Sequence, residues 1–250
     1  MMNKVTQGDC LEVMKSIPDG SIDMILCDLP YGTTQCKWDS IIDLKLLWCQ
    51  YERVIKENGA IVLTAQLPFD KTLGASNLKL LKYEWIWEKQ KATRFLDCKR
   101  RPLQAHENIL VFYKKQPTYN PQMVKGTPYD KGFRRTNADK SQAEIYGTFK
   151  GARIINESGM RYPRTVLKFN TAECDGKYHP TQKPISLMEY LIKTFTNEEE
   201  VVLDNTAGSG TTGIACINTN RNYFLIEKEQ KYFDIINKRI EDHVNQQKLF

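Results

Sequence analysis

The sequence of 250 residues predicts an α/β fold with a mostly parallel twisted sheet and helices on both faces. Apolar runs of strand length alternate with segments of helical periodicity. Several of these runs are apolar at nearly every position, as in strands that are buried on both faces. Three of them end in an acid, at Asp28, Asp204 and Glu227. Because ligands of open parallel sheets bind beyond the carboxyl ends of the strands, we expect a site there.

The N-terminal half supplies most of the expected sheet. Strands are expected over 5–8, 22–27, 59–65, 83–87 and 108–113, and helices over 10–17, 41–56 and 70–81. Leu11, Met14 and Ile17 have helical spacing, and apolar residues lie on one side of the helix expected over 41–56. A Pro-Asp-Gly turn precedes the strand at 22–27.

Residues 116–178 interrupt this pattern, because they are rich in Pro, Gly, Asn, Lys and Arg and show no long periodic stretch. A connection of this length is expected to be a functional insertion or to be partly disordered. The alternation then resumes, with helices over 185–195, from Gly213 and over 231–244, and strands over 201–204 and 223–226. We therefore expect three parts, residues 1–115, an irregular insertion over 116–178 and residues 179–250.

Composition restricts the setting in which the chain works. No run of 18 apolar residues occurs, and the first residues lack the apolar core of a signal peptide, so a cytoplasmic protein that crosses no membrane is expected. The seven cysteines are scattered without a C-x-x-C pair. This distribution indicates reduced thiols and argues against structural zinc, so no metal site is predicted.

The net charge of +6 is unevenly distributed along the chain. Residues 89–168 hold 18 Lys and Arg against 6 Asp and Glu, a net charge of +12, whereas the remainder carries −6. Aromatic residues are interleaved with these basic residues. Basic side chains neutralise phosphates and aromatic rings stack on bases, so the pattern favours a nucleic-acid surface over a solvated loop.

A small-residue loop follows the strand that ends at Asp204. It matches G-x-G-x-x-G at Gly208, Gly210 and Gly213, and Glu227 ends the next strand. An ordinary strand-to-helix turn would show the same local pattern. A nicotinamide-binding fold would need further strands downstream, but only one helix follows Glu227. The pattern thus suits a nucleoside-containing cofactor in a sheet whose chain is circularly permuted.

A second motif, Asp28-Leu29-Pro30-Tyr31, follows the strand at 22–27. A carboxylate and a main-chain carbonyl before a proline, which cannot donate, form an acceptor pair for an exocyclic amino group. The aromatic ring three residues after the acid can stack on a planar base. Alone this motif occurs in many ordinary loops. Here it follows a strand of the same expected sheet that carries the glycine loop.

Three stretches in this order resemble the β-class amino-group DNA methyltransferases of the N6-adenine type. They are Asp28 to Gly32, His179-Pro180-Thr181-Gln182-Lys183-Pro184, and Asp204 to Thr212, with the basic insertion between the first two. The similarity extends to Gly8-Asp9-Cys10 and to Glu227 with Tyr232. It implies a Rossmann-like S-adenosylmethionine-dependent methyltransferase fold, with a catalytic part over 1–115, a target-recognition insertion over 116–178 and a cofactor-binding part over 179–250.

The resemblance implies methyl transfer from S-adenosylmethionine to adenine N6 of a flipped-out base in double-stranded DNA. Asp28 and the Leu29 carbonyl would accept the two amino hydrogens. Pro30 follows them in the catalytic tetrapeptide, and the ring of Tyr31 would stack on the base. Asp9 would face the cofactor adenine, Glu227 the ribose, and Thr181 and Lys183 the cofactor's carboxylate end. The remaining implied cofactor contacts are Cys10, Asp28, Asp204, Thr206, Ala207, Gly208, Ser209, Gly210, Thr211 and Thr212.

Arginine and lysine clusters in the basic region are the candidate DNA contacts, either on phosphates or on guanine edges. They are Lys99, Arg100, Arg101, Arg134, Arg135, Arg161 and Arg164. His179 stands in a cofactor motif, which favours a binding or structural role over that of a general base. Cytosine C5 methylation is rejected, because it requires a Pro-Cys nucleophile that is absent here.

Two positions depart from the family pattern. Leu29 replaces the first proline of Asp-Pro-Pro-Tyr, which preserves the carbonyl, so activity is expected to survive. Asp204-Asn205-Thr206 replaces Asp-Pro-Phe, which removes an apolar contact to the cofactor.

Several alternatives stay open. Cytosine N4 methylation uses the same geometry, but that group more often begins its tetrapeptide with Ser, so Asp28 favours adenine. An RNA substrate, or a DNA-binding module with a relic cofactor fold, are further readings. A homodimer, a cognate restriction endonuclease and a bacterial or phage-infected host cell agree with the resemblance, but no residue pattern establishes them.

Overall fold

The computed structural model describes residues 3–32, 39–134, 152–172, 176 and 178–247. Two compact units divide the chain. The main unit combines Met1–Asn120 with Thr165–Phe250, and the smaller unit is Pro121–Arg164.

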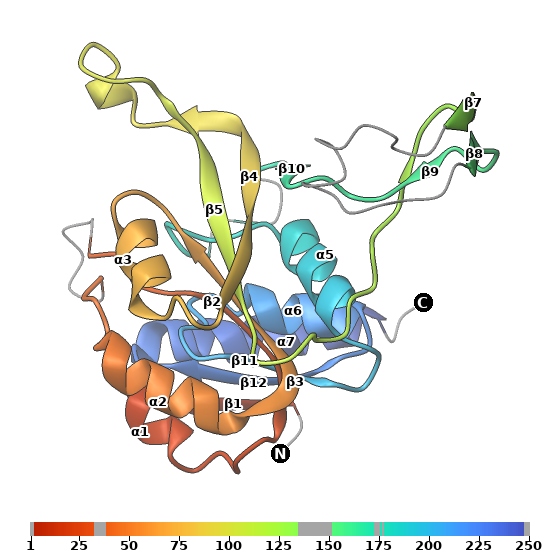
Figure 1. Cartoon of the computed structure of the whole chain (residues 1–250). Helices are drawn as coiled ribbons and strands as arrows, with labels where there is room; N and C mark the ends of the chain where they lie inside the picture. The colour runs from red at the N-terminus through yellow and green to blue at the C-terminus, as the bar shows by residue number, and fades with distance from the viewer. Residues whose placement is uncertain (1–2, 33–38, 135–151, 173–175, 177, 248–250) are drawn as a thin grey trace. The chain divides into compact units, whose positions relative to one another are not determined.

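An eight-stranded sheet forms the centre of the main unit (Figure 1). Its order is β1 (Lys4–Gln7), β12 (Asn222–Glu227), β11 (Val201–Asp204), β2 (Ile22–Asp28), β3 (Ile55–Ala65), β5 (Gln104–Phe112), β4 (Leu81–Thr93) and β10 (Val166–Phe169). All neighbours are parallel except β5, which is antiparallel to both β3 and β4. The predicted mostly parallel sheet is confirmed. The C-terminal strands β11 and β12 enter between β1 and β2, as the permuted order requires.

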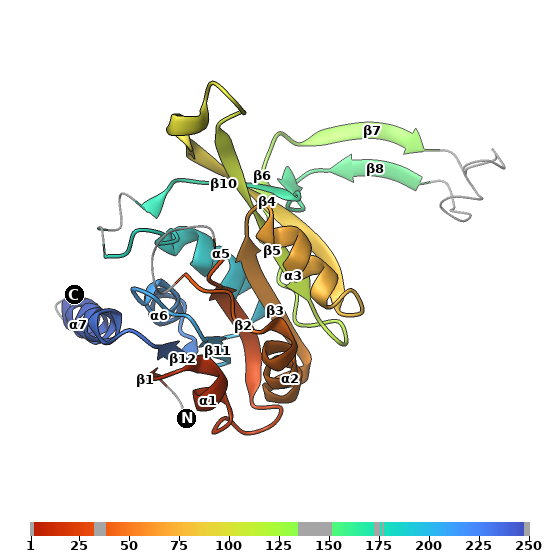
Figure 2. The same cartoon turned by 90° about the vertical axis from the view of Figure 1, so that its left-hand side faces the viewer.

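Helices cover both faces of the sheet (Figure 2). One face carries α1 (Cys10–Met14), α2 (Leu44–Val54) and α3 (Phe69–Ser76), and the other carries α5 (Ile185–Phe195), α6 (Thr211–Asn218) and α7 (Gln230–Gln247). Alternate residues of β2 enter the two cores, Ile25 with the first set of helices and Met24 with the second. Within the described residues, no helix combines the length and apolarity needed to span a membrane.

The helix expected over 70–81 is shorter than predicted, because α3 ends at Ser76. The Asn77 carbonyl accepts hydrogen bonds from the main-chain N–H groups of Leu80 and Leu81, which closes a turn into β4. The preceding Gly74 and Ser76 are weak helix formers, so little opposes this termination.

The segment 116–178, expected to be irregular, contains short strands in its described part. In the smaller unit β6 (Val124–Lys125) pairs with β9 (Met160–Arg161), and β7 (Tyr129–Arg134) pairs with β8 (Ala152–Asn156). β10 belongs to the main sheet, beside β4. Strands of two to six residues with mostly exposed side chains show no periodicity that a sequence pattern could reveal.

Candidate active site

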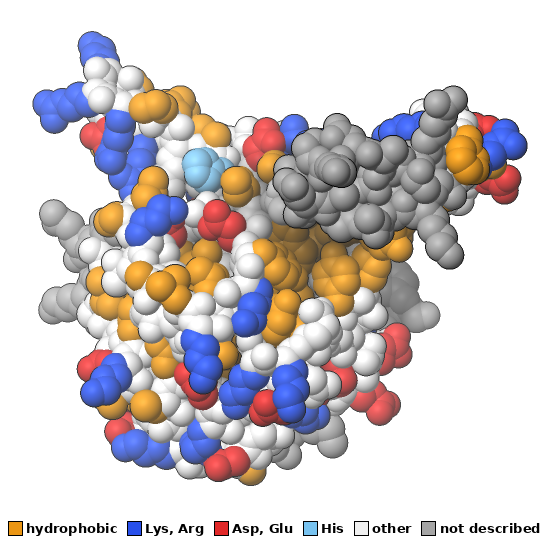
Figure 3. All heavy atoms as spheres, in the orientation of Figure 1, with side chains coloured by type: hydrophobic (Ala, Val, Ile, Leu, Met, Phe, Trp, Pro, Cys, Tyr) orange, Lys and Arg blue, Asp and Glu red, His pale blue; other side chains and the backbone are white. Residues whose placement is uncertain are grey.

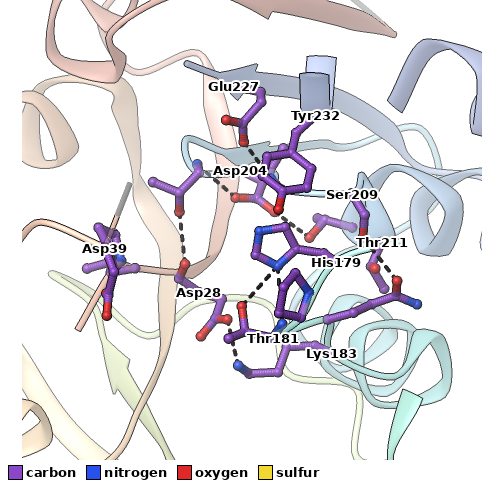
Figure 4. Close-up of a pocket in the computed structure, with 18 of the residues that line it drawn as sticks. Asp28, Asp39, His179, Thr181, Lys183, Asp204, Ser209, Thr211, Glu227 and Tyr232 are labelled. Atoms are coloured by element: carbon purple, nitrogen blue, oxygen red, sulfur yellow. Dashed lines mark hydrogen bonds and ion pairs between the residues drawn. The ribbon is translucent and has the colours of Figure 1, made fainter. Parts of the chain in front are cut away.

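A cavity of about 1060 Å³ lies in the main unit, where β2, β11 and β12 end (Figure 4). This exceeds the usual volume of a small-molecule site, so the cavity has room for a cofactor and a second group. Every residue predicted to be catalytic or to bind the cofactor lines it, except Gly210. Chain segments separated by up to about two hundred residues thus meet at the carboxyl edge of the sheet, where parallel strands present their ligands.

The glycine loop requires two residues with positive φ. Gly208 has φ +55° and Gly210 has φ +79°, a left-handed backbone that side chains with a Cβ rarely adopt. Gly210 directly precedes α6, and a Cβ there would lie 3.1 Å from Ile236 Cγ2. Gly210 therefore shapes the turn from outside the pocket lining.

Asp204 holds this loop together from its buried side. Its Oδ1 accepts a hydrogen bond from Thr206 N at 3.1 Å, and its Oδ2 accepts one from Thr212 Oγ1 at 2.6 Å. Burial raises the pKa of the Asp204 carboxyl to about 6, although these two donors oppose the rise.

We predict that the Asp204 carboxyl leaves a signature in the pH dependence of stability. The pKa of this carboxyl in the folded state lies above its unfolded value of 3.8. The stability that the protonated carboxyl contributes is therefore fully present below the unfolded pKa and is lost as the pH rises through about 6. Relative to an Asp204→Asn variant, the wild-type free energy of unfolding should fall by up to about 3 kcal/mol between about pH 4 and pH 7. Urea unfolding at a series of pH values measures this difference, and parallel curves would contradict the prediction.

Two further carboxylates face the pocket from the ends of neighbouring elements. Glu227 accepts hydrogen bonds from Gly208 N and Glu229 N, both at 2.8 Å, and burial raises its pKa. Asp9 caps α1 by accepting from Leu11 N at 3.0 Å, and Lys228 Nζ lies 3.5 Å from its other oxygen. Each Glu227 oxygen has a second lone pair, so it can also accept from ligand hydroxyls.

Asp28 has hydrogen-bond partners on both oxygens. Its Oδ1 accepts from Tyr31 Oη and from Thr64 Oγ1, each at 2.5 Å, and Lys183 Nζ lies 2.6 Å from Oδ2. The Asp28 main-chain carbonyl accepts from Thr206 Oγ1 at 3.1 Å, which ties the tetrapeptide to the glycine loop. The Tyr31 ring stacks on Phe69, with 5.5 Å between ring centroids.

The His-Pro-Thr-Gln-Lys stretch adds a second wall to the pocket. His179 lies against Tyr232 with 4.3 Å between ring centroids (Figure 4), and its Nδ1 accepts from Thr181 N at 3.2 Å. Burial lowers the pKa of His179 to about 4, so the ring is neutral near pH 7. Ser209 Oγ donates to Gln182 Oε1 at 3.2 Å, which joins this stretch to the glycine loop.

Several residues of the site carry no motif that predicts them. Asp39 accepts from Gly32 N at 2.8 Å and shapes the turn after the tetrapeptide, and Thr64 donates to Asp28 from β3. Arg239 of α7 is buried and donates to the Ser209 carbonyl at 3.0 Å. Its spacing of three residues from buried Ile236 is the one sequence signal for this position.

Asn205, which stands where the family pattern has proline, points into the core. Its Oδ1 accepts from Tyr51 Oη at 2.5 Å and from Cys27 Sγ at 2.8 Å. The polar replacement is therefore anchored beneath the glycine loop.

The predicted DNA contacts that the structure describes are exposed side chains. Lys99, Arg100 and Arg101 are exposed in the turn between β4 and β5, after the 3-10 helix η1 (Phe95–Asp97). Arg101 pairs with Asp97. In the smaller unit Arg161 is exposed, with its guanidinium over the Tyr129 ring, and Arg164 is exposed as well. Arg135 and the side chain of Arg134 lie outside the described residues.

Comparison with known proteins gives consistent matches along the chain. A family model described as DNA methylase matches residues 22–238. Type II methyltransferase M2.MboI of Moraxella bovis is 26% identical over 94% of this chain and 86% of its own length. DNA adenine methyltransferase YhdJ of Escherichia coli strain K12 is 27% identical over 95% and 82%. The solved complex of M1.HpyAVI with S-adenosylmethionine is 25% identical, with a TM-score of 0.65, over 95% and 100%.

The fold and the pocket, taken with these matches, define an S-adenosylmethionine-dependent methyltransferase. The chain belongs to the DNA methylase family that covers N6 and N4 amino methylation. The resemblance read from the three ordered motifs is thereby confirmed.

Proposed function

We propose that the protein methylates adenine N6 in double-stranded DNA, with Asp28 and the Leu29 carbonyl as the acceptors for the amino group. The observation that carries this proposal is the Asp28 carboxylate, which lines the same cavity as the glycine loop. The similarity to a relative named as a DNA adenine methyltransferase supports adenine over cytosine.

The residues of the pocket suit S-adenosylmethionine on their own chemistry. The left-handed glycine loop allows close approach of a ligand, and Glu227 offers carboxylate oxygens to ribose hydroxyls. When bound, this cofactor supplies an activated methyl group on a sulfonium. Asp9 and Cys10 line the pocket beside Glu227 and are the proposed contacts to the cofactor adenine.

Asp28 acts by positioning and by charge. Accepting the amino hydrogens turns the nitrogen lone pair, otherwise delocalised into the ring, toward the methyl group. The carboxylate would also stabilise the positive charge that the nitrogen gains as its bond to carbon forms and the carbon–sulfur bond breaks, and it is the proposed acceptor of the proton that the nitrogen then loses. Tyr31, which donates a hydrogen bond to Asp28, is the proposed stacking partner of the extruded base.

The turn between β4 and β5 is the proposed contact to the DNA backbone in the main unit. Basic side chains gather at its tip (Figure 3). Thr93, the last residue of β4, lines the pocket, so the basic turn begins at the rim of the cavity. A duplex whose base enters the pocket would therefore pass close to Lys99 and Arg100.

We expect Lys99→Ala/Arg100→Ala to weaken binding of mixed-sequence plasmid DNA. Each lost phosphate contact lowers the slope of log affinity against log salt by about 0.9, so the slope should fall by about 2. A matched control is Lys79→Ala/Lys82→Ala, which removes the same charge near the opposite end of β4. Fluorescence titration over a salt series measures both, and equal slopes for wild type and the tip variant would exclude this turn from the interface.

The test of the activity is transfer of labelled methyl groups from S-adenosylmethionine to duplex DNA of mixed sequence, with RNA of mixed sequence in parallel. Label in DNA alone supports the proposal. Cofactor binding without label in either would favour a DNA-binding module, and label in RNA alone would change the substrate. Base flipping, a homodimer and a cognate endonuclease remain predictions of the family resemblance.

A further inference from the structure

Lys183 occupies the centre of a buried chain of alternating charges. Its Nζ lies 2.6 Å from Asp28 Oδ2 and 3.3 Å from Glu107 Oε2, and Lys89 pairs with the other oxygen of Glu107. The side chains of Lys183, Glu107 and Lys89 are each less than 10% exposed. Four elements thus contribute to one network, namely β2, β4, β5 and the segment before α5.

The charges in this network stabilise one another. Burial lowers the pKa of Lys183, but Asp28 and Glu107 outweigh this, so the pKa is raised and the amine stays charged. Burial likewise raises the pKa of Glu107, but Lys183 and Lys89 outweigh it and the pKa is lowered. Removing any one of these groups leaves a buried charge without its partner, which strongly destabilises the protein. Each group is therefore held in place by its neighbours in the network.

This arrangement does not suit the role that the motif implies for Lys183. Two lysines and two carboxylates already balance to zero charge, so a further carboxylate from the cofactor would gain little attraction here. The ammonium group donates a hydrogen bond to Asp28 Oδ2 and forms an ion pair with Glu107 Oε2.

We infer that Lys183 is a positioning residue for Asp28, with Glu107 and Lys89 behind it, and not a ligand of the cofactor carboxylate. This inference rests on the proposed function of Asp28. The ionic contact fixes Oδ2, whereas Oδ1 is held by the neutral hydroxyls of Tyr31 and Thr64. Hydrogen bonds between a charged donor and a charged acceptor are stronger than those with a neutral partner. An arriving amino group therefore displaces the hydroxyls from Oδ1 and leaves Oδ2 in place.

Tyr31 consequently has two roles in turn. Before the base arrives, its hydroxyl satisfies the Asp28 carboxylate, and when the amino group takes over Oδ1, the ring is released to stack on the base. Thr64 is buried on β3, and its hydroxyl donates to Oδ1 until the amino group takes that position.

Lys183→Met separates the two possible roles of this lysine. We expect the single-turnover rate of methyl transfer at saturating S-adenosylmethionine to fall by about 100-fold, because the acceptor oxygen is misplaced. The affinity for S-adenosylmethionine, measured by calorimetry, should stay within about threefold of wild type. Lys183→Arg, which retains the charge, should recover part of the rate, and Glu107→Gln should reduce the rate with unchanged cofactor affinity.

Lys56→Met is the matched control, because Lys56 pairs with Asp23 at 2.5 Å at the far end of β2. It should leave both the rate and the affinity near wild type, and thermal unfolding checks that each variant is folded. If Lys183→Met weakens cofactor binding more than about tenfold, or keeps the wild-type rate, the inference is wrong.

Failure of the proposed function gives a different result. A wild-type protein that transfers no methyl group to DNA would refute that function. The cofactor affinity of Lys183→Met would still distinguish the two roles of Lys183. A loss of affinity would mean that Lys183 binds the cofactor, and an unchanged affinity would mean that it does not. If Lys183→Met does not fold, Glu107→Gln tests the inference in the active enzyme, because it should lower the transfer rate without changing the cofactor affinity.

Discussion

Asp28→Ala is expected to abolish methyl transfer and to leave cofactor binding intact. The variant loses the carboxylate that accepts the amino hydrogens and stabilises charge on nitrogen, so the transfer rate should fall by at least about 100- to 1000-fold. Because the proposed partner of Asp28 is the base, affinity for S-adenosylmethionine should change by less than about threefold. Single-turnover transfer and calorimetry measure the two quantities on the same preparation.

The same strand offers a control for Asp28. Asp23 lies near the start of β2, is buried, and pairs with Lys56. Asp23→Ala removes a carboxylate of equal size far from the pocket, so it should lower stability but keep the transfer rate. Loss of cofactor affinity in Asp28→Ala would mean that Asp28 binds the cofactor, and its assignment to the base would then be wrong.

Glu227→Ala should show the opposite pattern. This carboxylate accepts from Gly208 N and faces the pocket, so the variant loses both the proposed ribose acceptor and an anchor of the glycine loop. Hydrogen bonds with a charged partner are worth about 1.5–3 kcal/mol, so affinity for S-adenosylmethionine should fall by about 10- to 100-fold. Saturating cofactor should restore much of the transfer rate, because Asp28 is untouched.

Glu200 provides the comparison for Glu227, since it also accepts a main-chain hydrogen bond, from Asn197 N at 2.8 Å. It lies before β11 and outside the pocket lining. Glu200→Ala should bind the cofactor as wild type does. Equal affinities for Glu227→Ala and wild type would remove Glu227 from the cofactor site.

The sheet was predictable where strands are buried on both sides. β2, β11 and β12 are nearly continuous apolar runs, and each ends at an acid, at Asp28, Asp204 and Glu227. The strands of the smaller unit are short and mostly exposed, so no apolar pattern records them. The early end of α3 depends on a turn at Asn77 that helical spacing does not reveal.

The residues of the site were predictable where they belong to a sequence motif. The tetrapeptide and the glycine loop reach one pocket because both follow parallel strands. The partners of Asp28 were not predictable, because Thr64 and Glu107 belong to other strands and carry no motif. Lys183 was found by its motif, but its contact with Asp28 is a tertiary fact that spacing cannot express.

The identity of the methylated nucleoside tests the central claim most directly. Duplex DNA of mixed sequence is incubated with the protein and S-adenosylmethionine, digested to nucleosides and separated by chromatography with mass detection. We expect N6-methyl-2′-deoxyadenosine as the product from wild-type protein, and none from Asp28→Ala. N4-methylcytosine as the product, or equal yields from both proteins, would contradict it.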